Sequence, residues 1–358
     1  MESLEMMEFY RGKRVFVTGH TGFKGSWLCR ILLKLGAEVS GYALSPEGEN
    51  LFDLCGVEPL MRSVIGDIRE EGALSAAFRD ARPDVVLHLA AQPLVQEGYR
   101  NPAATYETNV MGTVRILDCV RQSESVGSLV NVTTDKVYRN EEWPWGYRET
   151  DILDGHDPYS NSKSCSELVT HSYRDSFFRG KDVGISTMRA GNVIGGGDFA
   201  ENRILPDCVR AAVAKQPIFL RNPDAVRPYQ HVLEPLFAYL LVASQQYRNP
   251  EKAGAYNVGP EKEGCVSNRE LAQIFCNAWG DGMKWKAPPH ADRFPEANLL
   301  RLDCSKIAAE FGWKPRWGIR TAVKKTVEWT REYLDGGDMG QMMERQIDEF
   351  ISGGGENV

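Results

Sequence analysis

The sequence feature that most constrains the fold is a strand, a glycine-rich loop and a helix that follow one another directly near the N-terminus. The run KRVFVT at 13–18 predicts a buried strand, and apolar residues at helical spacing predict a helix over 23–35, which Gly36 ends. The loop between them, TGHTGFKG, places Gly19, Gly22 and Gly25 where a tight turn and a close backbone approach are needed. Because the amides of a helix N-terminus attract anions, the loop predicts a site for the diphosphate of a dinucleotide.

Short apolar strands continue to alternate with helices through the first half of the chain. Further strands are predicted at 39–43, 61–66, 85–89, 128–132 and 183–188, with helices at 103–122 and 160–178. This alternation requires parallel pairing, with helices covering both faces of the sheet. We therefore predict an α/β fold: a Rossmann-type doubly wound parallel sheet with a smaller C-terminal substrate-binding domain, and ligands at the carboxyl ends of the strands.

The sequence changes character after Ala190, where the glycine-rich segment GNVIGGGDFAENR begins. We expect residues 8–190 to form the dinucleotide-binding Rossmann domain, with later strands returning to it around 226–260. Residues 191–335 are expected to form mostly the substrate-binding domain. The polar stretch 336–358, with GGG near its end, is expected to be a loosely ordered tail.

Composition and charge exclude several classes of function. A formal net charge of −7 argues against a nucleic-acid partner, which would require a basic surface. No apolar run reaches the roughly 18 residues of a membrane span, and the acidic N-terminus does not resemble a signal peptide. The eight cysteines are scattered and form no C-x-x-C pair, so neither a metal site nor a disulfide framework is expected. These features predict a cytoplasmic protein without a membrane partner.

A tyrosine, a lysine and a threonine form the predicted catalytic group. Tyr159 and Lys163 are four residues apart near the start of the 160–178 helix and therefore share one face. A phenol has a pKa near ~10 and needs a nearby cation to act as a base at neutral pH, which a lysine can supply. Thr134 lies just after the carboxyl end of the 128–132 strand, where its hydroxyl could bind a substrate oxygen.

These motifs together resemble the extended branch of the short-chain dehydrogenase/reductase superfamily. The G-x-x-G-x-x-G spacing, the HLAAQ segment at 88–92 and Asn109 in ETNVMGT all match that branch, although His88 is expected to be packed. The resemblance implies NAD as cofactor, and the absence of a basic residue in GYALSP at 41–46 favours NAD over NADP. Asp67 is expected either to contact the adenine or to cap the following helix. The implied cofactor-binding residues are Gly19, Thr21, Gly22, Phe23, Lys24, Gly25, Asp67, Ile68, Leu89, Ala90, Ala91, Asn109, Thr133, Tyr159 and Lys163.

The two residues after Thr134 indicate the reaction. Nucleotide-sugar 4,6-dehydratases carry an Asp-Glu pair there for an elimination, and this sequence has Asp135 and Lys136, a departure shared by the dehydratases that act on CDP-glucose. The alternative reading is an ion pair at a surface turn. The segments at 189–207, 226–232 and 300–315 resemble the same CDP-glucose enzymes. The implied substrate-binding residues are Gln92, Asn192, Arg203, Arg227 and Tyr229, of which Arg227 has a guanidinium suited to diphosphate oxygens.

The resemblance thus implies an NAD-dependent lyase of deoxysugar biosynthesis, such as that of O-antigen lipopolysaccharide, acting on CDP-glucose by preference. The alternatives are a sugar-nucleotide 4-epimerase, a 4,6-dehydratase for another nucleotide hexose, and a non-catalytic NAD-sensing scaffold. Which group removes the carbon 5 proton is left open, because Lys136 would need a strongly lowered pKa to do so. A homodimer or homotetramer is expected, formed through apolar residues on the 103–122 and 160–178 helices.

Overall fold

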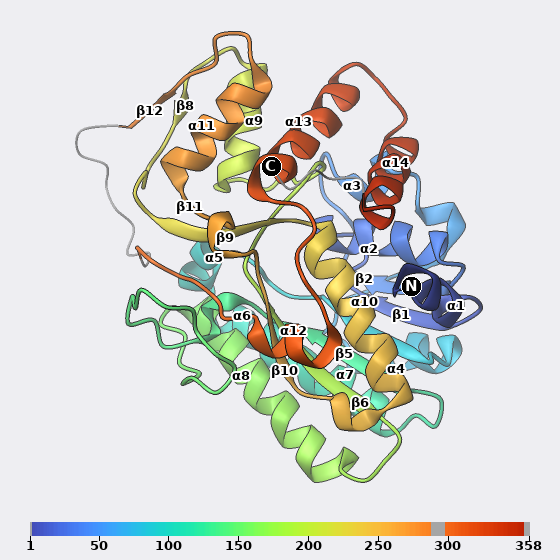
Figure 1. Ribbon diagram of the computed structural model, residues 1–358. Coiled ribbons are helices and arrows are strands. Elements are labelled where there is room, and N and C mark those ends of the chain that lie inside the picture. The colour runs from blue at the N-terminus through green and yellow to red at the C-terminus, as the bar shows by residue number, and fades with distance from the viewer. Residues whose placement is uncertain (1, 288–297, 354–358) are drawn as a thin grey trace.

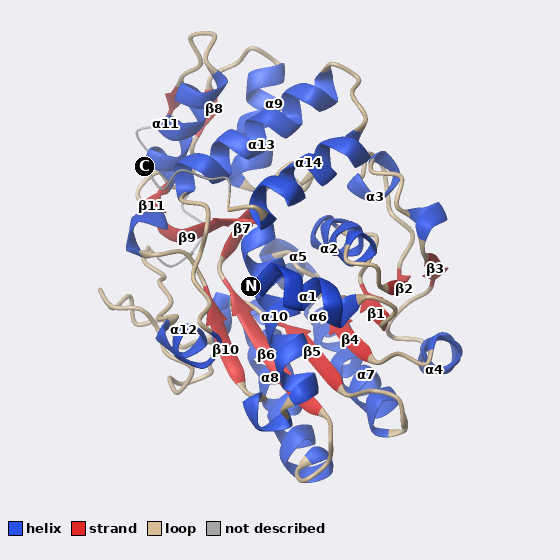
Figure 2. Ribbon diagram, turned by 45° about the vertical axis from the view of Figure 1, so that its right-hand side comes forward, coloured by secondary structure: helices blue, strands red, loops and turns tan. Residues whose placement is uncertain are grey.

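A computed structural model describes residues 2–287 and 298–353, and its centre is a parallel sheet (Figures 1 and 2). Within the described residues this sheet has seven strands, every neighbouring pair of which is parallel. In their order across the sheet they are β10 (Ala255–Val258), β6 (Gly184–Ala190), β5 (Ser128–Val132), β4 (Val85–His88), β1 (Arg14–Thr18), β2 (Glu38–Ala43) and β3 (Arg62–Ile65). The order reverses direction between β1 and β4, which is where a doubly wound sheet opens its ligand crevice.

Helices cover both faces of the sheet. Successive side chains of a strand point to opposite faces, and in β1 those on each face are apolar. Val15 and Val17 of β1 pack into one apolar cluster, whereas Phe16 between them packs into another. The first cluster holds residues of α1 (Glu2–Tyr10), α2 (Phe23–Lys34), α10 (Leu233–Arg248) and α14 (Met339–Ile351). The second holds residues of α4 (Glu71–Ala81), α7 (Gly112–Arg121) and α8 (Pro158–Tyr173).

A smaller part of the chain lies beyond the carboxyl edge of the sheet, at the top of Figure 1. Its own apolar cluster joins side chains from three helices, α9, α11 and α13. The elements here are β7 (Asn192–Ile194), α9 (Ile204–Val213), β8 (Ile218–Phe219), β9 (Val226–His231), β11 (Cys265–Ser267), α11 (Asn268–Trp279), β12 (Trp285–Lys286) and α13 (Ile319–Leu334). The remaining short helices are α3 (Leu51–Leu54), α5 (Val95–Arg100), α6 (Pro102–Tyr106) and α12 (Ser305–Phe311).

The predicted strands and helices of the first half are confirmed to within a few residues. The helix expected at 103–122 is α6 and α7 joined by a π-helical turn at Glu107–Met111, and a second π turn at Arg174–Phe178 ends the helix expected at 160–178. Of the strands expected to return around 226–260, β10 does join the main sheet. β9 does not: it pairs with β7 and β11 in a separate sheet.

The prediction of a loosely ordered tail at 336–358 is wrong for its described part. Asp338 caps α14, whose buried face includes Met343, Ile347 and Phe350. These residues pack into the same cluster as α2 and α10, so the C-terminal helix is part of the main core. The periodicity of Met339, Met343, Ile347 and Phe350 carries this signal in the sequence, but the flanking glycines obscured it. Residues 354–358, and 288–297 within the predicted substrate-binding domain, lie outside the described part.

Among the residues that the structure describes, no helix is long and apolar enough to cross a membrane. Within the same residues, no group of three or more His, Cys, Asp or Glu side chains is arranged to hold a metal ion.

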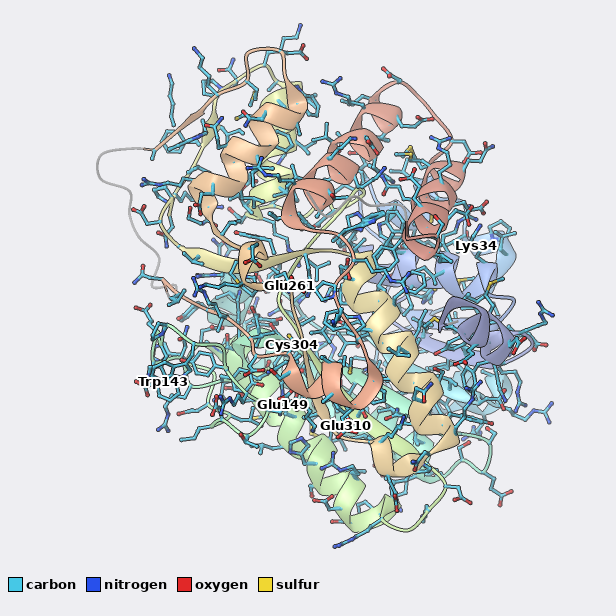
Figure 3. All side chains as sticks on the ribbon, viewed as in Figure 1. Lys34, Trp143, Glu149, Glu261, Cys304 and Glu310 are labelled. Atoms are coloured by element: carbon cyan, nitrogen blue, oxygen red, sulfur yellow. The ribbon has the colours of Figure 1, made fainter. Side chains whose placement is uncertain are left out.

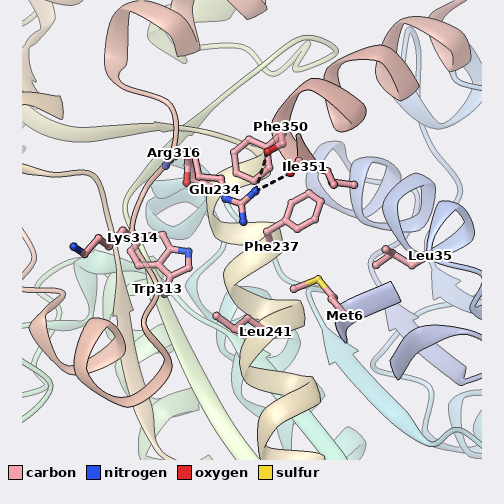
Figure 4. Close-up of a pocket in the computed structure, with 10 residues that line it drawn as sticks. All are labelled: Met6, Leu35, Glu234, Phe237, Leu241, Trp313, Lys314, Arg316, Phe350 and Ile351. Carbon is pink, nitrogen blue, oxygen red and sulfur yellow. Dashed lines mark hydrogen bonds between the residues drawn. The ribbon is translucent and has the colours of Figure 1, made fainter. Parts of the chain in front are cut away.

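Glu234 is a buried carboxylic acid at the junction of α10, α14 and the segment before α13 (Figure 4). Its Oε1 accepts the amides of Arg316 and Trp317 at 2.9 and 2.6 Å. Burial raises the pKa of Glu234 from its ordinary 4.5 to about 7, although these amides and the Arg316 charge act against the rise. The side chain therefore fastens the 313–317 segment to α10 and favours its own protonated form.

Replacing Glu234 by glutamine is expected to reduce the pH dependence of stability. Because its pKa is higher in the folded protein, Glu234 stabilises the fold fully below about pH 4.5 and loses that contribution as the pH rises through about 7. The full shift corresponds to about 3 kcal/mol. In Glu234→Gln, the fall in Tm between about pH 5 and about pH 8 should shrink by about 2–4 °C relative to the wild type. Exposed Glu310→Gln serves as control, and an undiminished fall in Glu234→Gln would contradict the assignment.

Candidate active site

A cleft of about 360 Å³ lies between the carboxyl edge of the sheet and the smaller part of the chain. Its walls come from the end of β5, the start of α8, β7, β9 and the segment leading into α9. The structure brings ten of the predicted site residues to this cleft: Lys24, Thr133, Thr134, Asp135, Lys136, Tyr159, Asn192, Arg203, Arg227 and Tyr229.

Tyr159 lies in the first turn of α8, which begins two residues earlier than predicted. The Asp157 carboxylate accepts the Ser160 amide at 3.0 Å and caps the helix, and Pro158 occupies its first position. A helix N-terminus favours negative charge, so this position favours a phenolate. Burial raises the pKa of Tyr159 to about 12, whereas a hydrogen bond with Thr134 and the charge of Arg203 act to lower it.

Thr134 and Asp135 stand at the carboxyl end of β5, where a single 3₁₀ turn begins. The Thr134 hydroxyl accepts the Lys136 amide at 3.4 Å and donates to Oδ1 of Asp135 at 3.0 Å. Asp135 is 1% exposed, and its Oδ2 has no hydrogen-bond partner among the described residues. Burial raises the pKa of Asp135, although Lys136 and Thr134 oppose the rise. A buried carboxyl of this kind is suited to donate a proton. Its burial contradicts the alternative of a surface ion pair.

Two lysines lie near this group: Lys163, which is buried, and Lys24, which is partly buried and lines the cleft. The ammonium of Lys163 donates to the carbonyl of Val132 at 3.1 Å. Burial and the nearby charge of Lys24 lower the pKa of Lys163 to about 8, while Glu167 acts to raise it. Burial and Arg203 lower the pKa of Lys24 to about 8 as well. Each lysine can therefore change its protonation state within the neutral to mildly alkaline range.

The glycine loop has the shape that a diphosphate requires. A Cβ on Gly19, whose φ is +76°, would lie 2.8 Å from the Ala90 amide nitrogen, and one on Gly25 would lie 2.1 Å from the Gly19 carbonyl oxygen. Neither position tolerates a side chain. Gly22 differs, since a Cβ there meets nothing nearer than the Gly19 oxygen at 3.5 Å. Gly22 caps α2 without a side-chain hydrogen bond, so no cap side chain competes with a diphosphate for the first amides of the helix.

The other predicted cofactor residues surround this loop. The Thr21 hydroxyl donates to the Leu44 carbonyl at 2.9 Å, and the Thr18 hydroxyl accepts the amides of Leu89 and Ala90, which precede Ala91. Asp67 binds Arg69 through its carboxylate at 2.6 Å. The alternative role of Asp67 as a helix cap is wrong, because α4 begins at Glu71.

Several predicted residues bind other parts of the protein. Asn109, in the first π turn, accepts the Gln92 amide at 2.8 Å and donates to the Ser162 hydroxyl at 2.8 Å. The Gln92 side chain donates to Thr105 at 2.9 Å and is not among the residues that line the cleft. His88 contacts Thr18 and Thr113 and is packed as expected, with burial lowering its pKa to about 3. Ile68 packs under α7, and Phe23 packs at the edge of the core near Gly195.

On the substrate side of the cleft, polar side chains are held by hydrogen bonds to neighbouring residues. Arg203 binds Asp198 at 3.0 Å, and Arg227, which is 6% exposed, donates to the Val226 carbonyl at 2.9 Å. The Tyr229 hydroxyl donates to Asn268 at 2.5 Å. Asn192 pairs with Tyr229 across β7 and β9.

One end of this cleft is formed by residues that no sequence motif predicted. The segment Ile218–Asn222 and α5, with Gln96 and Tyr99, also line it. Arg221 in that segment binds Asn202 at 2.8 Å and Asp207 at 3.3 Å. No local motif marks these residues, since they reach the cleft through the packing of β8 on α9 and of α5 on α8.

The comparisons with known proteins place these features in a family. Residues 16–326 match the family model described as GDP-mannose 4,6 dehydratase. This chain belongs to that family. The GDP-mannose 4,6 dehydratase match spans the glycine loop, the Thr134–Lys136 turn, α8 and the substrate side of the cleft.

Two curated relatives are similar over nearly the whole chain. CDP-glucose 4,6-dehydratase of Salmonella typhimurium is 44% identical over 355 residues, which cover 96% of this chain and 98% of the relative. dTDP-glucose 4,6-dehydratase of Streptomyces antibioticus is 31% identical over 332 residues, with 89% and 92% covered. The resemblance to nucleotide-sugar dehydratases is therefore confirmed.

Solved structures confirm the predicted fold class. A double mutant of dTDP-glucose 4,6-dehydratase from Streptomyces venezuelae, with NAD bound, has a TM-score of 0.77 and 27% identity, covering 90% of this chain and 98% of its own. UDP-glucose 4-epimerase of Thermus thermophilus, in complex with NAD, has a TM-score of 0.77 and 26% identity, with 88% and 98% covered. Both solved chains match over nearly all of their length, so the shared fold extends beyond the parallel sheet.

Proposed function

We propose that this protein is an NAD-dependent CDP-glucose 4,6-dehydratase, a hydro-lyase that forms CDP-4-keto-6-deoxy-D-glucose. The observation that carries the proposal is Asp135, a buried carboxyl whose Oδ2 is unpartnered among the described residues, one position from Thr134 and in the same cleft as Tyr159. An oxidation needs only the threonine, tyrosine and lysine. An acid beside them supplies what an elimination needs in addition. The choice of CDP-glucose rests on the relative of 44% identity.

The glycine loop fits NAD, because the space at Gly22 and the uncapped start of α2 suit its diphosphate. We assign the adenine side to Asp67 and Ile68, and the nicotinamide side to the β5 end and α8. When bound, NAD supplies the oxidation at carbon 4 and the reduction at carbon 6 that precede and follow the elimination. The residues assigned to it are Gly19, Thr21, Gly22, Phe23, Lys24, Gly25, Asp67, Ile68, Leu89, Ala90, Ala91, Asn109, Thr133, Tyr159 and Lys163. Thr133 is assigned through its backbone, because its hydroxyl donates to Glu167.

The residues of the cleft move the protons of this reaction. Tyr159, as phenolate, accepts the proton of the sugar 4-hydroxyl, while Thr134 holds the same oxygen. A ketone at carbon 4 makes the carbon 5 proton acidic, so water can leave across carbons 5 and 6. Asp135, whose pKa burial raises, donates its proton in its acid form to the departing 6-hydroxyl. Lys163 provides positive charge near the phenolate.

The cations of the cleft suit an anionic sugar nucleotide. The chain as a whole is acidic, yet Lys24, Lys136, Arg203 and Arg227 all line the cleft. We assign the diphosphate to Arg227 and Asn192, with Arg203 and Tyr229 in support, because a guanidinium matches diphosphate oxygens. Gln92 is left out of this assignment because its side chain binds Thr105.

We further propose a cytoplasmic enzyme of deoxysugar biosynthesis, such as that leading to O-antigen lipopolysaccharide, which assembles as a homodimer or homotetramer. Exposed apolar side chains on the helices expected to pair support the assembly. Met111 follows α6, Leu168 lies on α8 and Phe177 lies in the turn after it, and they are 44%, 54% and 42% exposed.

Incubation with CDP-, dTDP-, UDP- and GDP-hexoses, followed by mass spectrometry, tests the proposal. We expect loss of water from CDP-glucose and a 4-keto-6-deoxy product, with no net consumption of NAD. A product of unchanged mass with inverted carbon 4 would instead identify an epimerase. Absence of any conversion, despite NAD binding, would favour a non-catalytic scaffold.

Lys136→Ala is expected to lower product formation by about 10²-fold while NAD still binds. Lys136 lies beside Asp135 in the cleft, where it can remove the carbon 5 proton when neutral or stabilise the resulting negative charge when protonated. Steady-state turnover and a fluorescence titration of NAD measure the two effects. Exposed Lys181→Ala, after the π turn that follows α8, is the control, and turnover of Lys136→Ala equal to it would contradict both roles.

A further inference from the structure

Glu167 is a buried carboxylate directly behind the catalytic residues, and the reaction described above does not use it. It is fully buried on α8, eight residues after Tyr159 and four after Lys163, so the three side chains lie on one face of the helix. Four groups approach its two oxygens. The Thr133 hydroxyl donates to Oε1 at 2.5 Å, and the Thr187 hydroxyl donates to Oε2 at 2.6 Å. Arg189 binds Oε2 at 2.9 Å, and the His171 ring lies 3.5 Å from the same oxygen.

These contacts fix the charge of Glu167. Burial alone raises the pKa of the carboxyl, but Arg189 and the two hydroxyls lower it below its ordinary value. Arg189 is itself held by the Tyr138 hydroxyl at 2.8 Å and by the carbonyl of Glu149, which is labelled in Figure 3, at 3.1 Å. Glu167 is therefore an ionised, immobile acceptor, and it stands where β5, β6 and α8 meet.

Three consecutive residues at the end of β5 each lie against a residue of α8. Lys163 donates to the Val132 carbonyl at 3.1 Å, and Thr133 donates to Glu167. Thr134, the next residue, lines the cleft together with Tyr159 and acts to lower the pKa of its phenol. Asp135 follows directly. The position of residues 134–136 relative to Tyr159 therefore depends on the contacts that Val132 and Thr133 make with α8.

We propose that Glu167 is a positioning residue of the active site, which acts through Thr133 to hold the end of β5 at the distance from α8 at which Thr134 meets Tyr159. This inference rests on the proposed function. Thr187 and Arg189 tie the same carboxylate to β6, so α8 is fastened to a strand that carries no catalytic side chain. The Thr133 hydroxyl in turn fixes the position of β5, the strand that leads into Thr134 and Asp135.

Thr133→Val tests the inference, with Thr187→Val as a matched control. Glu167→Ala is unsuitable, because it would leave the buried Arg189 charge without its carboxylate and is expected not to fold. Both threonines are buried, each donates one hydroxyl to Glu167, and valine has the same shape. The two variants should therefore lose similar stability, which thermal unfolding measures.

Only Thr133→Val should change catalysis. We expect its kcat to fall about tenfold or more, with KM and NAD affinity within about threefold of the wild type. Because Thr134 acts to lower the pKa of Tyr159 and would be displaced, the acid limb of the kcat profile should move to higher pH. Thr187→Val should keep the wild-type kcat and pH profile.

Two outcomes would overturn the inference. Equal kcat and equal pH profiles in the two variants would mean that Glu167 only holds the fold together. Weakened NAD binding in Thr133→Val with an unchanged kcat would mean that Thr133 contacts the cofactor and transmits nothing. Failure of the proposed function is distinguished by the wild type, which would then form no 4-keto-6-deoxy product from any nucleotide hexose.

Discussion

Asp135→Asn should stop the reaction after the oxidation, so that addition of CDP-glucose produces a lasting NADH absorbance and almost no 4-keto-6-deoxy product. Asparagine has the size of aspartic acid and can still accept the Thr134 hydroxyl, which bonds Oδ1 at 3.0 Å. It cannot transfer a proton to the departing 6-hydroxyl. Loss of a general acid costs about 10²–10⁴-fold in rate, so we expect product formation to fall by about 10³-fold.

The pH dependence of the wild type gives a second measurement of the same group. Burial raises the pKa of Asp135, so its acid form persists to higher pH than that of an ordinary carboxyl. The elimination should therefore fail as the pH rises through that value, and the alkaline limb of the kcat profile should be lost in Asp135→Asn.

A matched control for this variant lies further along the same loop. Asp154 pairs with Arg139 at 2.9 Å, half-exposed and outside the cleft, so Asp154→Asn should keep at least about half of the wild-type turnover. The acid assignment would be wrong if Asp135→Asn formed product at the control rate, or if it formed neither NADH nor product while still binding both ligands.

The fold could be predicted from local patterns because each strand and helix of the first half carries its own. Val15, Phe16 and Val17 make β1 apolar on both of its faces, as a strand buried between two helical layers requires. The glycine loop between β1 and α2 is typical of dinucleotide-binding folds. The pairing of Tyr159 with Lys163 could be predicted in the same way, because a four-residue spacing on a helix fixes their relative positions.

What could not be predicted depends on contacts between distant segments. α14 is held in place by residues of α2 and α10 more than a hundred positions away, and its own sequence is polar on one face with glycines on both sides. Arg221 reaches the cleft because β8 pairs with β12 and lies against α9. Glu167 follows the tyrosine and lysine at the same helical spacing, but its partners on β5 and β6 emerge only from the strand register.

Tyr159→Phe should have the largest effect of any single substitution, because it prevents the first chemical step. The phenylalanine ring fills the same buried position but carries no hydroxyl to accept the proton of the sugar 4-hydroxyl. We expect turnover to fall by about 10³-fold or more, with NAD and CDP-glucose still bound. In the wild type, the base form of Tyr159 gains population as the pH rises toward its pKa, which burial raises to about 12 in this structure, so the acid limb of kcat should disappear with the hydroxyl.

The state of the cofactor separates this variant from Asp135→Asn. Both variants should form almost no product, but Tyr159→Phe should show no NADH absorbance after substrate is added, since oxidation itself is blocked. Tyr106→Phe is the control, because its hydroxyl also binds α8, through Asn161 at 2.9 Å, and lies outside the cleft. If Tyr159→Phe accumulated NADH as Asp135→Asn does, the proton of the 4-hydroxyl would have another acceptor. Lys163, whose pKa burial lowers to about 8, would then be the group to replace next.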